Sequence, residues 1–468
     1  MRKKYKNLAV NTALLALGSF STSFLGLIFT PLYTNVLSTA EYGIYDLIVT
    51  TSSLLYPFFT LAIGEAILRY ALDKSSDKHT IFSSGMHVCL VGLLLLILAF
   101  PIVSRTVIKE YSVYFYAYFF MHCVGVITMN FVKGIEDVKH YSIAGIVKTV
   151  IMISLNLICL LLLKTGVRGY LFSVIAGQVV AFLYLFFASK LYRYLRPFWK
   201  MDFGLVKKTL IYSIPIIPNS ISWWISNSSD KYILKYYTDL SQIGIYSVSY
   251  KIPSIIMTVM TVFLSAWQLS AVVDFGSEES SEFFTDIYKK CIDANFLIAS
   301  MVIAFSPIMS KILFAKDFFS AWKYVPVLVL ANVFNVLATF LGSVYTSAKK
   351  TKMLALTTVF AALTNIILNF VLIPKFGAMG AAIATMIAYF CMWIFRIINT
   401  RKIIRIDFDL KNDIICLFAL GLQIILLESR TFVGWIITLL IFAIMLVIKR
   451  ALFVSLISIV LNKFRKTN

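Results

Sequence analysis

The sequence is poor in charged residues, cysteine and histidine. Only 14% of the 468 residues are charged, against ~25% in a typical soluble domain. The six cysteines show no C-x-x-C pair and no histidine at metal-ligand spacing, and the four histidines are isolated along the chain. No Walker A and no H-E-x-x-H motif occurs. The sequence therefore predicts no catalytic residue, no metal site and no bound cofactor, and we expect the protein not to be an enzyme.

Apolar residues, by contrast, dominate the chain. They make up 60% of it, and the mean hydropathy is +0.86. A helix rises ~1.5 Å per residue and the bilayer core is ~30 Å thick, so each crossing needs ~20 mostly apolar residues. The net charge of +21 would fit a nucleic-acid partner, but the cations form short clusters between apolar segments instead of one basic face. We expect a membrane protein with the lipid bilayer as its surroundings and no nucleic-acid partner.

The sequence predicts an all-α polytopic protein with about fourteen membrane spans. The predicted spans are residues 9–31, 43–63, 81–103, 113–132, 143–163, 169–190, 208–228, 242–266, 291–314, 324–345, 353–373, 378–398, 413–428 and 431–448. The basic N-terminal residues followed by an apolar segment resemble a secretory signal, but the segment continues without an A-x-A cleavage site. We therefore expect a retained first helix. Residues 451–461 are too short to cross and are expected to lie at the interface or to finish the last helix.

The distribution of lysine and arginine predicts the topology. If the N-terminus is cytoplasmic, most of the 43 lysines and arginines fall in the N-terminal tail, the even-numbered loops and the C-terminal tail. This is the bias that the positive-inside rule describes. We expect both termini in the cytoplasm.

An internal repeat divides the predicted spans. Gly43-Ile44-Tyr45 opens the second span, and Gly244-Ile245-Tyr246 opens the eighth. Six spans separate the two copies, so both have the same orientation, as in transporters built from parallel repeats. We predict two pseudo-symmetric six-helix lobes, residues 1–200 and 208–398, and two further helices with a basic tail in 413–468. A substrate site is expected between the lobes.

Lys251 is the sharpest candidate for a substrate contact. It lies well inside the eighth predicted span, two residues before Pro253. An ionisable group at this depth costs ~2.5–3.5 kcal/mol by insertion scales and is a functional candidate by default. We predict that Lys251 faces a central cavity and binds an anionic group such as phosphate. The alternative is a structural lysine that snorkels or pairs with a carboxylate.

Two pairs of charged residues are further candidates. Arg69, at the cytoplasmic end of the second span, is a candidate substrate contact, and Glu65 precedes it by one helical turn. A simple i,i+4 ion pair is the alternative. Asp230 and Lys231 end the seventh span. In one interpretation, Lys231 contacts substrate and Asp230 serves coupling or gating. In the other, the two residues have a mutual or capping role.

Coupling and gating have their own candidates. Asp46 either pairs with a cation of the facing lobe or couples transport to H⁺ or Na⁺ movement. Pro215 and Pro218 remove two backbone donors from the seventh span and predict a kink that acts as a gate. Lys148, early in the fifth span, is expected to reach the cytoplasmic surface, and Gln178 is expected to hydrogen-bond between helices.

Several motifs resemble one transporter family. They are Tyr42-Gly43-Ile44-Tyr45, Pro215-Ile216-Ile217-Pro218, the segment 229–234 leading to Ile243-Gly244-Ile245-Tyr246, and the segment 369–382. In their order and spacing they are similar to those of polysaccharide or O-antigen repeat-unit flippases of the multidrug, oligosaccharidyl-lipid and polysaccharide exporter superfamily. The resemblance covers nearly the whole chain.

The resemblance implies a function. The chain would move an undecaprenyl-pyrophosphate-linked oligosaccharide from the cytoplasmic to the outer leaflet of the bacterial cytoplasmic (inner) membrane by alternating access, for O-antigen, capsule or exopolysaccharide synthesis. A polysaccharide polymerase and a chain-length regulator would be its partners. A multidrug or cation antiporter of the same superfamily and a non-transporting scaffold of a glycan-assembly complex are the alternatives.

Overall fold

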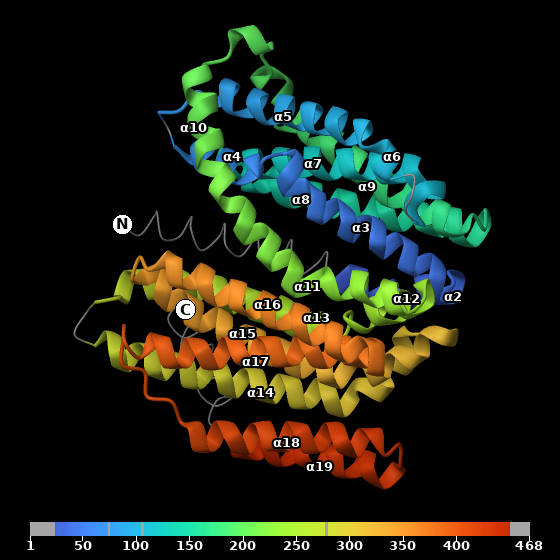
Figure 1. Cartoon of the computed structure of the whole chain (residues 1–468), viewed down its shortest axis with the longest axis vertical. Coiled ribbons are helices and arrows are strands. Elements are labelled where there is room, and N and C mark those ends of the chain that lie inside the picture. Colours follow the sequence, from blue (N-terminus) through green and yellow to red (C-terminus); the bar gives the residue numbers. More distant parts are fainter. Residues whose placement is uncertain (1–23, 74, 104–106, 277–278, 450–468) are drawn as a thin grey trace, which may run out of the picture. The chain divides into compact units, whose positions relative to one another are not determined.

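The protein is all-α, as the sequence predicts. The computed structural model describes residues 24–73, 75–103, 107–276 and 279–449, and these ranges contain helices and no strand (Figure 1). Most of the predicted first span and the segment 451–461 lie outside the described residues.

The chain forms two compact units, and the first ends at Gly244. Its helices are α2 (Thr30–Val36), α3 (Thr39–Phe59), α4 (Ile63–Leu72), α5 (Lys78–Leu98), α6 (Phe100–Val103), α7 (Ser112–Gly134), α8 (Val138–Asn156), α9 (Gly166–Ala188), α10 (Phe203–Ser213) and α11 (Ile217–Tyr237). Short helical turns join them: η1 (Val107–Tyr111), η2 (Leu157–Leu162), η3 (Leu191–Tyr194), η4 (Phe198–Lys200) and η5 (Ile214–Ile216). Helix α12 (Leu240–Ser249) begins in this unit.

The second unit begins at Ile245. It contains α13 (Pro253–Asp274), α14 (Ser280–Leu313), η6 (Lys316–Lys323), α15 (Val325–Ser347), α16 (Thr351–Phe376), α17 (Ala378–Thr400), α18 (Leu410–Glu428) and α19 (Phe432–Ile448). Helix α15 is the most buried membrane helix of the described chain and packs against α13, α14, α16 and α17. Helices α18 and α19 form a hairpin on α14 (Figure 1).

The helices agree with the predicted spans. Within the described ranges, nine helices are long and apolar enough to cross a membrane, and two bent helix pairs bring the number to eleven. Of two shorter apolar helices, Phe24–Val36 overlaps the described end of the first predicted span, and Phe432–Ile448 coincides with the last. The seventh predicted span corresponds to α10 and α11. The count of about fourteen is therefore consistent with the structure.

Helices α10 and α11 belong to the first unit as the structure has it. Helix α10 contacts α4 and α5, and α11 contacts α3. The lobe bounds read from the repeat, 1–200 and 208–398, stay a prediction.

Two broken spans correspond to the repeated motif. Helices α3 and α4 meet at a 65° bend, where Leu61 and Ala62 both have positive φ. Helix α12 and the start of α13 meet at a 45° bend. These are the second and eighth predicted spans, which open on the two copies of Gly-Ile-Tyr, so the repeat in sequence is matched by a repeat in helix shape.

Helix α7 organises the first unit. It packs against α3, α4, α5, α8 and α9. Side chains four residues apart form its buried face: Phe115, Phe119, Cys123, Ile127 and Phe131, each at most 1% exposed. Residues four apart lie on one side of a helix. Other residues of α7, among them Met121, His122 and Gly125, line the pocket described next.

Candidate functional site

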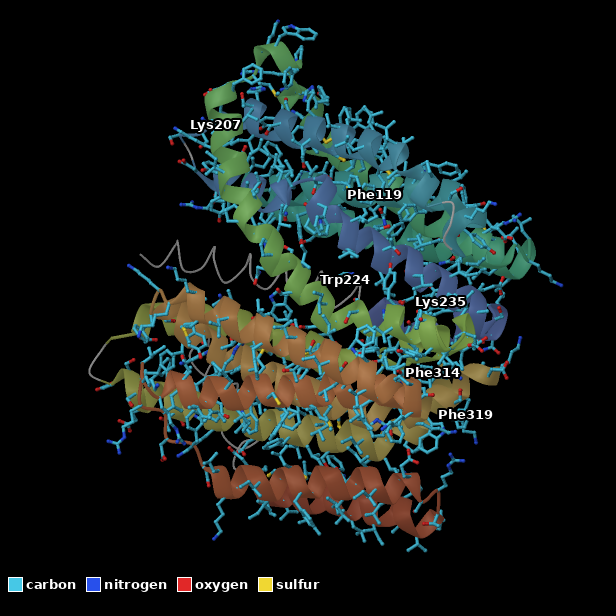
Figure 2. The ribbon with its side chains drawn as sticks, viewed as in Figure 1. Phe119, Lys207, Trp224, Lys235, Phe314 and Phe319 are labelled. Atoms are coloured by element: carbon cyan, nitrogen blue, oxygen red, sulfur yellow. The ribbon has the colours of Figure 1, made fainter. Side chains whose placement is uncertain are left out.

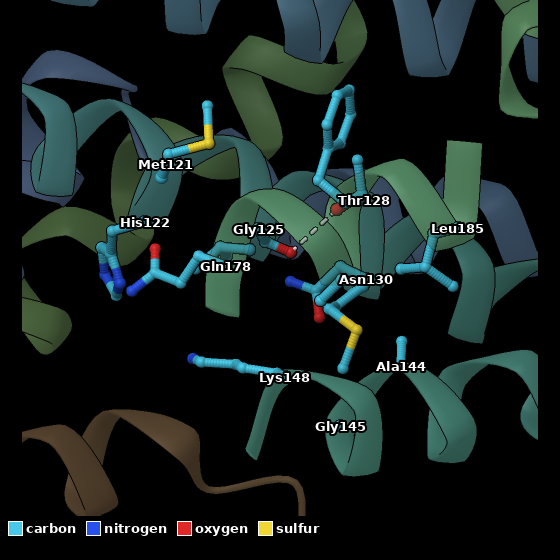
Figure 3. A pocket seen from close by; sticks show the side chains of 14 residues that line it. Met121, His122, Gly125, Thr128, Asn130, Ala144, Gly145, Lys148, Gln178 and Leu185 are labelled. Carbon is cyan, nitrogen blue, oxygen red and sulfur yellow. Dashed lines mark hydrogen bonds between the residues drawn. The ribbon is translucent and has the colours of Figure 1, made fainter. Parts of the chain in front are cut away.

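A pocket of about 290 Å³ lies between α7, α8 and α9 of the first unit. Five of its lining side chains are polar: His122, Thr128, Asn130, Lys148 and Gln178 (Figure 3). His122, Lys148 and Gln178 come from three different helices. The spans that carry them are Lys109–Gly134, Val138–Leu162 and Gly166–Ala188. Each of the three residues is near the middle of its span, and Lys148 lies ~15 Å from the start of its helix at ~1.5 Å per residue. The pocket is therefore at membrane depth.

Local packing holds these helices close together at the pocket. A Cβ on Gly177 would come within 2.8 Å of the carbonyl oxygen of Lys148, so glycine lets α9 approach α8 at this level. On α7, the ring of His122 stacks on Tyr118, with 6.0 Å between centroids, and meets the edge of Tyr56 at 5.7 Å. These contacts fix the wall that carries His122.

The pocket has cationic and hydrogen-bonding groups. The Lys148 side chain is exposed to it, and no carboxylate is among the described residues that line it. Gln178 is only 8% exposed, and its Oε1 has no hydrogen-bond partner in the described structure. Asn130, also on the wall, donates from Nδ2 to the carbonyl oxygen of Gly64 at 3.0 Å. Such a set of groups suits an anionic, hydroxylated ligand better than a cation.

Lys251 lies at the break between α12 and α13. Its backbone N–H donates to the carbonyl oxygen of Val248 at 2.9 Å, and its own carbonyl accepts from Ser254 Oγ at 2.7 Å. Helix α13 begins two residues later at Pro253. Non-helical backbone at membrane depth is tolerated where it is buried in protein or lines a watery cavity. The structure thus places this half-buried lysine at a break in a span.

Asp46 and Lys231 form an ion pair between α3 and α11. Lys231 Nζ lies 2.9 Å from Asp46 Oδ2, and the two side chains are 12% and 16% exposed. Trp224 lies on α11 (Figure 2). Its indole N–H donates to the carbonyl oxygen of Thr50 at 2.9 Å, one helical turn from Asp46. The hydroxyls of Tyr232 and Thr51 are also hydrogen-bonded. Helix α11 is therefore attached to α3 through consecutive polar contacts.

The other predicted residues are more dispersed. Asp230 is 2% exposed and accepts from the Lys231 backbone N–H at 2.9 Å. Pro215 lies in η5 and Pro218 in the first turn of α11, where the α-helix gives way to a 3₁₀ turn. Glu65 and Arg69 are both exposed on α4, and in the part of the chain that the structure describes no ion pair joins them.

The pocket was not predicted from the sequence, from which we expected Lys148 to reach the cytoplasmic surface. The predicted span begins at residue 143, whereas α8 begins at Val138 and is capped by the Asp137 side chain, which accepts from the His140 N–H. An aspartate just before an apolar segment is a helix-start signal. With that start, Lys148 would have been counted near mid-span.

Comparison with known proteins shows which proteins this chain is similar to. A family model described as "polysaccharide biosynthesis protein" matches residues 8–268, more than half of the chain. An uncharacterized membrane protein of Methanocaldococcus jannaschii is 23% identical over 438 residues, covering 83% of each chain. A probable low-salt glycan biosynthesis flippase of Haloferax volcanii, Agl15, is 22% identical over 235 residues, covering 49% of this chain and 48% of its own.

Solved structures share the fold. The lipid II flippase MurJ in an inward closed conformation has a TM-score of 0.71 at 14% identity, covering 95% of this chain and 100% of its own. An inward-facing MATE-family multidrug resistance transporter of the MOP superfamily has a TM-score of 0.67 at 12% identity, covering 83% and 98%. At these identities the likeness is one of fold.

Proposed function

Because the chain belongs to the family of polysaccharide biosynthesis proteins, we propose that it is a flippase for a lipid-linked oligosaccharide. The substrate is an undecaprenyl-pyrophosphate-linked repeat unit, carried from the cytoplasmic to the outer leaflet by alternating access. The protein lies in the bacterial cytoplasmic membrane with both termini in the cytoplasm. The product serves O-antigen, capsule or exopolysaccharide synthesis, with a polymerase and a chain-length regulator as candidate partners.

The observation that carries the proposal is the position of Lys251 at the break between α12 and α13. A flippase must hold a phosphate-bearing head group at membrane depth while its lipid tail stays in the bilayer. A lysine at a break in a span meets that need, because charged groups inside membranes mark substrate pathways and lysine binds phosphate as a point charge. In this mechanism Lys251 holds the pyrophosphate.

The remaining predicted residues have supporting roles in the proposal. Arg69 is exposed on α4, beyond the break in the second span, and is a candidate for the first contact with an incoming phosphate. The break at Pro215 and Pro218 is the proposed gate, since a 3₁₀ turn between two helices lets one move against the other. Asp46, Glu65 and Asp230 are the candidates for H⁺ or Na⁺ coupling.

A multidrug antiporter is the first alternative. Cationic drugs need acidic groups in the binding pocket, whereas the described wall of the α7–α9 pocket has Lys148 and no carboxylate. This observation favours an anionic substrate. A non-transporting scaffold is the second alternative, and a transport assay separates it from a flippase.

Complementation in cells tests the proposal. A host that lacks its own flippase is supplied with the wild type, Lys251→Ala, Lys251→Arg or the control Lys350→Ala, which changes an exposed lysine of the α15–α16 loop. We expect surface polymer with the wild type and the control, none with Lys251→Ala, and partial recovery with Lys251→Arg, at equal membrane insertion. Normal polymer with Lys251→Ala would overturn the role of Lys251, and no polymer with the wild type would count against the substrate.

A further inference from the structure

We infer that the pocket between α7, α8 and α9 is a subsite for one acidic sugar of the transported glycan, with Lys148 binding its carboxylate. The inference rests on the proposed function, because it assigns a substrate class to a site within the flippase. It concerns the glycan part of the substrate, whereas Lys251 is proposed to hold the pyrophosphate.

The charge of the pocket matches a single negative group. Lys148 Nζ makes no hydrogen bond or ion pair within the ranges that the structure describes. An amine at membrane depth without a protein counter-charge favours an anionic ligand that supplies one. One carboxylate balances one lysine. A pyrophosphate would bring more negative charge than the single lysine on this wall neutralises.

The hydrogen-bonding groups match a hydroxylated ring. The Oε1 atom of Gln178 is buried and has no partner in the described structure, and such an acceptor is costly unless a donor reaches it. A sugar hydroxyl is such a donor. The side chains of His122, Lys148 and Gln178 extend to the same side of the pocket (Figure 3), so a hydroxyl and a carboxylate of one ring can be bound together. Met121 and Phe182 supply apolar surface for the ring carbons.

The size of the pocket limits what it holds. Its volume of about 290 Å³ is at the lower end of the ~300–1,000 Å³ that small-molecule pockets span. It is therefore a place for one sugar ring and not for a whole repeat unit. The other sugars of the repeat unit must lie outside this pocket during transport.

A binding experiment tests the inference directly. The purified full-length protein is titrated with methyl glucuronide and, separately, with methyl glucoside, which differs in having a hydroxymethyl group in place of the carboxylate. Binding is followed by calorimetry on the wild type, Lys148→Met, Lys148→Arg and Lys139→Met. Lys139 lies at the start of the same helix, is exposed and does not line the pocket, so it is the matched control.

We expect the wild type and Lys139→Met to bind the glucuronide at least tenfold more tightly than the glucoside. Lys148→Met should lose this preference, and Lys148→Arg should keep part of it. Equal affinity for the two sugars, or a preference that survives in Lys148→Met, would overturn the inference. Binding of inorganic phosphate in preference to the glucuronide would also overturn it, because it would mark a phosphate site.

A transport experiment separates this inference from the proposed function. Liposomes containing the protein are given two lipid-linked glycans that differ only in glucuronate against glucose at one position. Faster transport of the acidic glycan, abolished selectively by Lys148→Met, supports the subsite. Equal transport of both glycans by the wild type and by Lys148→Met would refute the subsite and leave the flippase function intact. Transport of neither glycan would refute the flippase function, and the sugar titration would then decide the subsite.

Discussion

Lys231 Nζ lies 2.9 Å from Asp46 Oδ2, in a contact that joins α11 to α3 within the first unit. Both side chains are mostly buried, at 12% and 16% exposure. Removing one charge leaves the other unpaired in a poorly solvated environment, and this lowers the stability of the fold more than removing both charges does. The pair therefore binds α11, the helix that follows the proline break, to the second predicted span.

Removing one charge of this pair should destabilise the protein more than removing both. We expect Asp46→Asn and Lys231→Met each to lower the free energy of unfolding by about 2–3 kcal/mol, with a double variant clearly less destabilised than the sum. Unfolding in detergent with a denaturant titration measures this. Lys235→Met, four residues further along α11, is the control and should have little effect. Additive losses would show that the two charges are not coupled.

The glycines of the repeated motif should not tolerate a side chain. A Cβ on Gly43 would clash with the carbonyl oxygen of Leu240, and one on Gly244 would clash with that of Thr39. Gly43→Ala and Gly244→Ala are each expected to lower the thermal midpoint, because the clashing atoms belong to the backbone and can move only if a helix shifts. Gly421→Ala is the control, because its Cβ would meet nothing within 4 Å and alanine is the better helix former by about 1 kcal/mol. A midpoint raised by all three substitutions would contradict the close approach.

We expect acid to destabilise the start of α5, because it protonates the Asp77 carboxylate that caps this helix. Burial alone would raise the pKa of this carboxyl, but hydrogen bonds from the Thr80 side chain and the His79 N–H, together with Arg196 at 2.9 Å, hold its pKa below the usual 3.8. A carboxyl with a lower pKa in the folded state stabilises fully above its unfolded pKa, ~3.9, and loses this contribution as the pH falls through the folded pKa.

The thermal midpoint measured against pH checks this. Asp77→Ala removes a helix cap and should cost about 1 kcal/mol at pH 7. The difference between wild type and Asp77→Ala should be constant above about pH 5 and should shrink below pH ~4. A difference that grows in acid would contradict the assigned direction. Arg196→Gln should also reduce the stability that is lost in acid, because it removes the cation beside Asp77.

Arg396 should be irreplaceable in the second unit. Its guanidinium is 1% exposed and donates to the carbonyl oxygen of Ala338 at 2.6 Å and to the hydroxyls of Thr357 and Thr358 at 3.0 and 3.2 Å. Arg396→Ala leaves these acceptors unpaired and creates a cavity, with an expected loss of about 3 kcal/mol. Arg396→Lys should recover only part, because one ammonium cannot reproduce the planar fork. The exposed Lys402→Ala should be neutral, and a neutral Arg396→Ala would refute this role.

Helix existence was predictable from the sequence because each crossing must be apolar over its whole length. The break at residues 60–62 was not predicted, since Leu61 and Ala62 have positive φ without glycine or proline at these positions. The break at Pro215 was predicted because proline lacks a donor. The partner of Asp46 could not be read from sequence, because pairing Asp46 with Lys231 depends on how α3 and α11 pack. The start of the fifth span was predicted at residue 143, about one turn after the observed start of α8 at Val138, so the position of Lys148 within the span was underestimated.

Transport by purified protein in liposomes tests the function most directly. Vesicles containing the wild type, Lys251→Ala or Lys350→Ala, and empty vesicles, are loaded with a fluorescent lipid-linked oligosaccharide, and its appearance in the opposite leaflet is measured with a membrane-impermeant quencher. We expect the wild type and Lys350→Ala to flip the lipid well above the empty vesicles, and Lys251→Ala to fall to their level. Wild-type vesicles that flip no faster than empty ones would contradict the flippase assignment, and an active Lys251→Ala would contradict the role of Lys251.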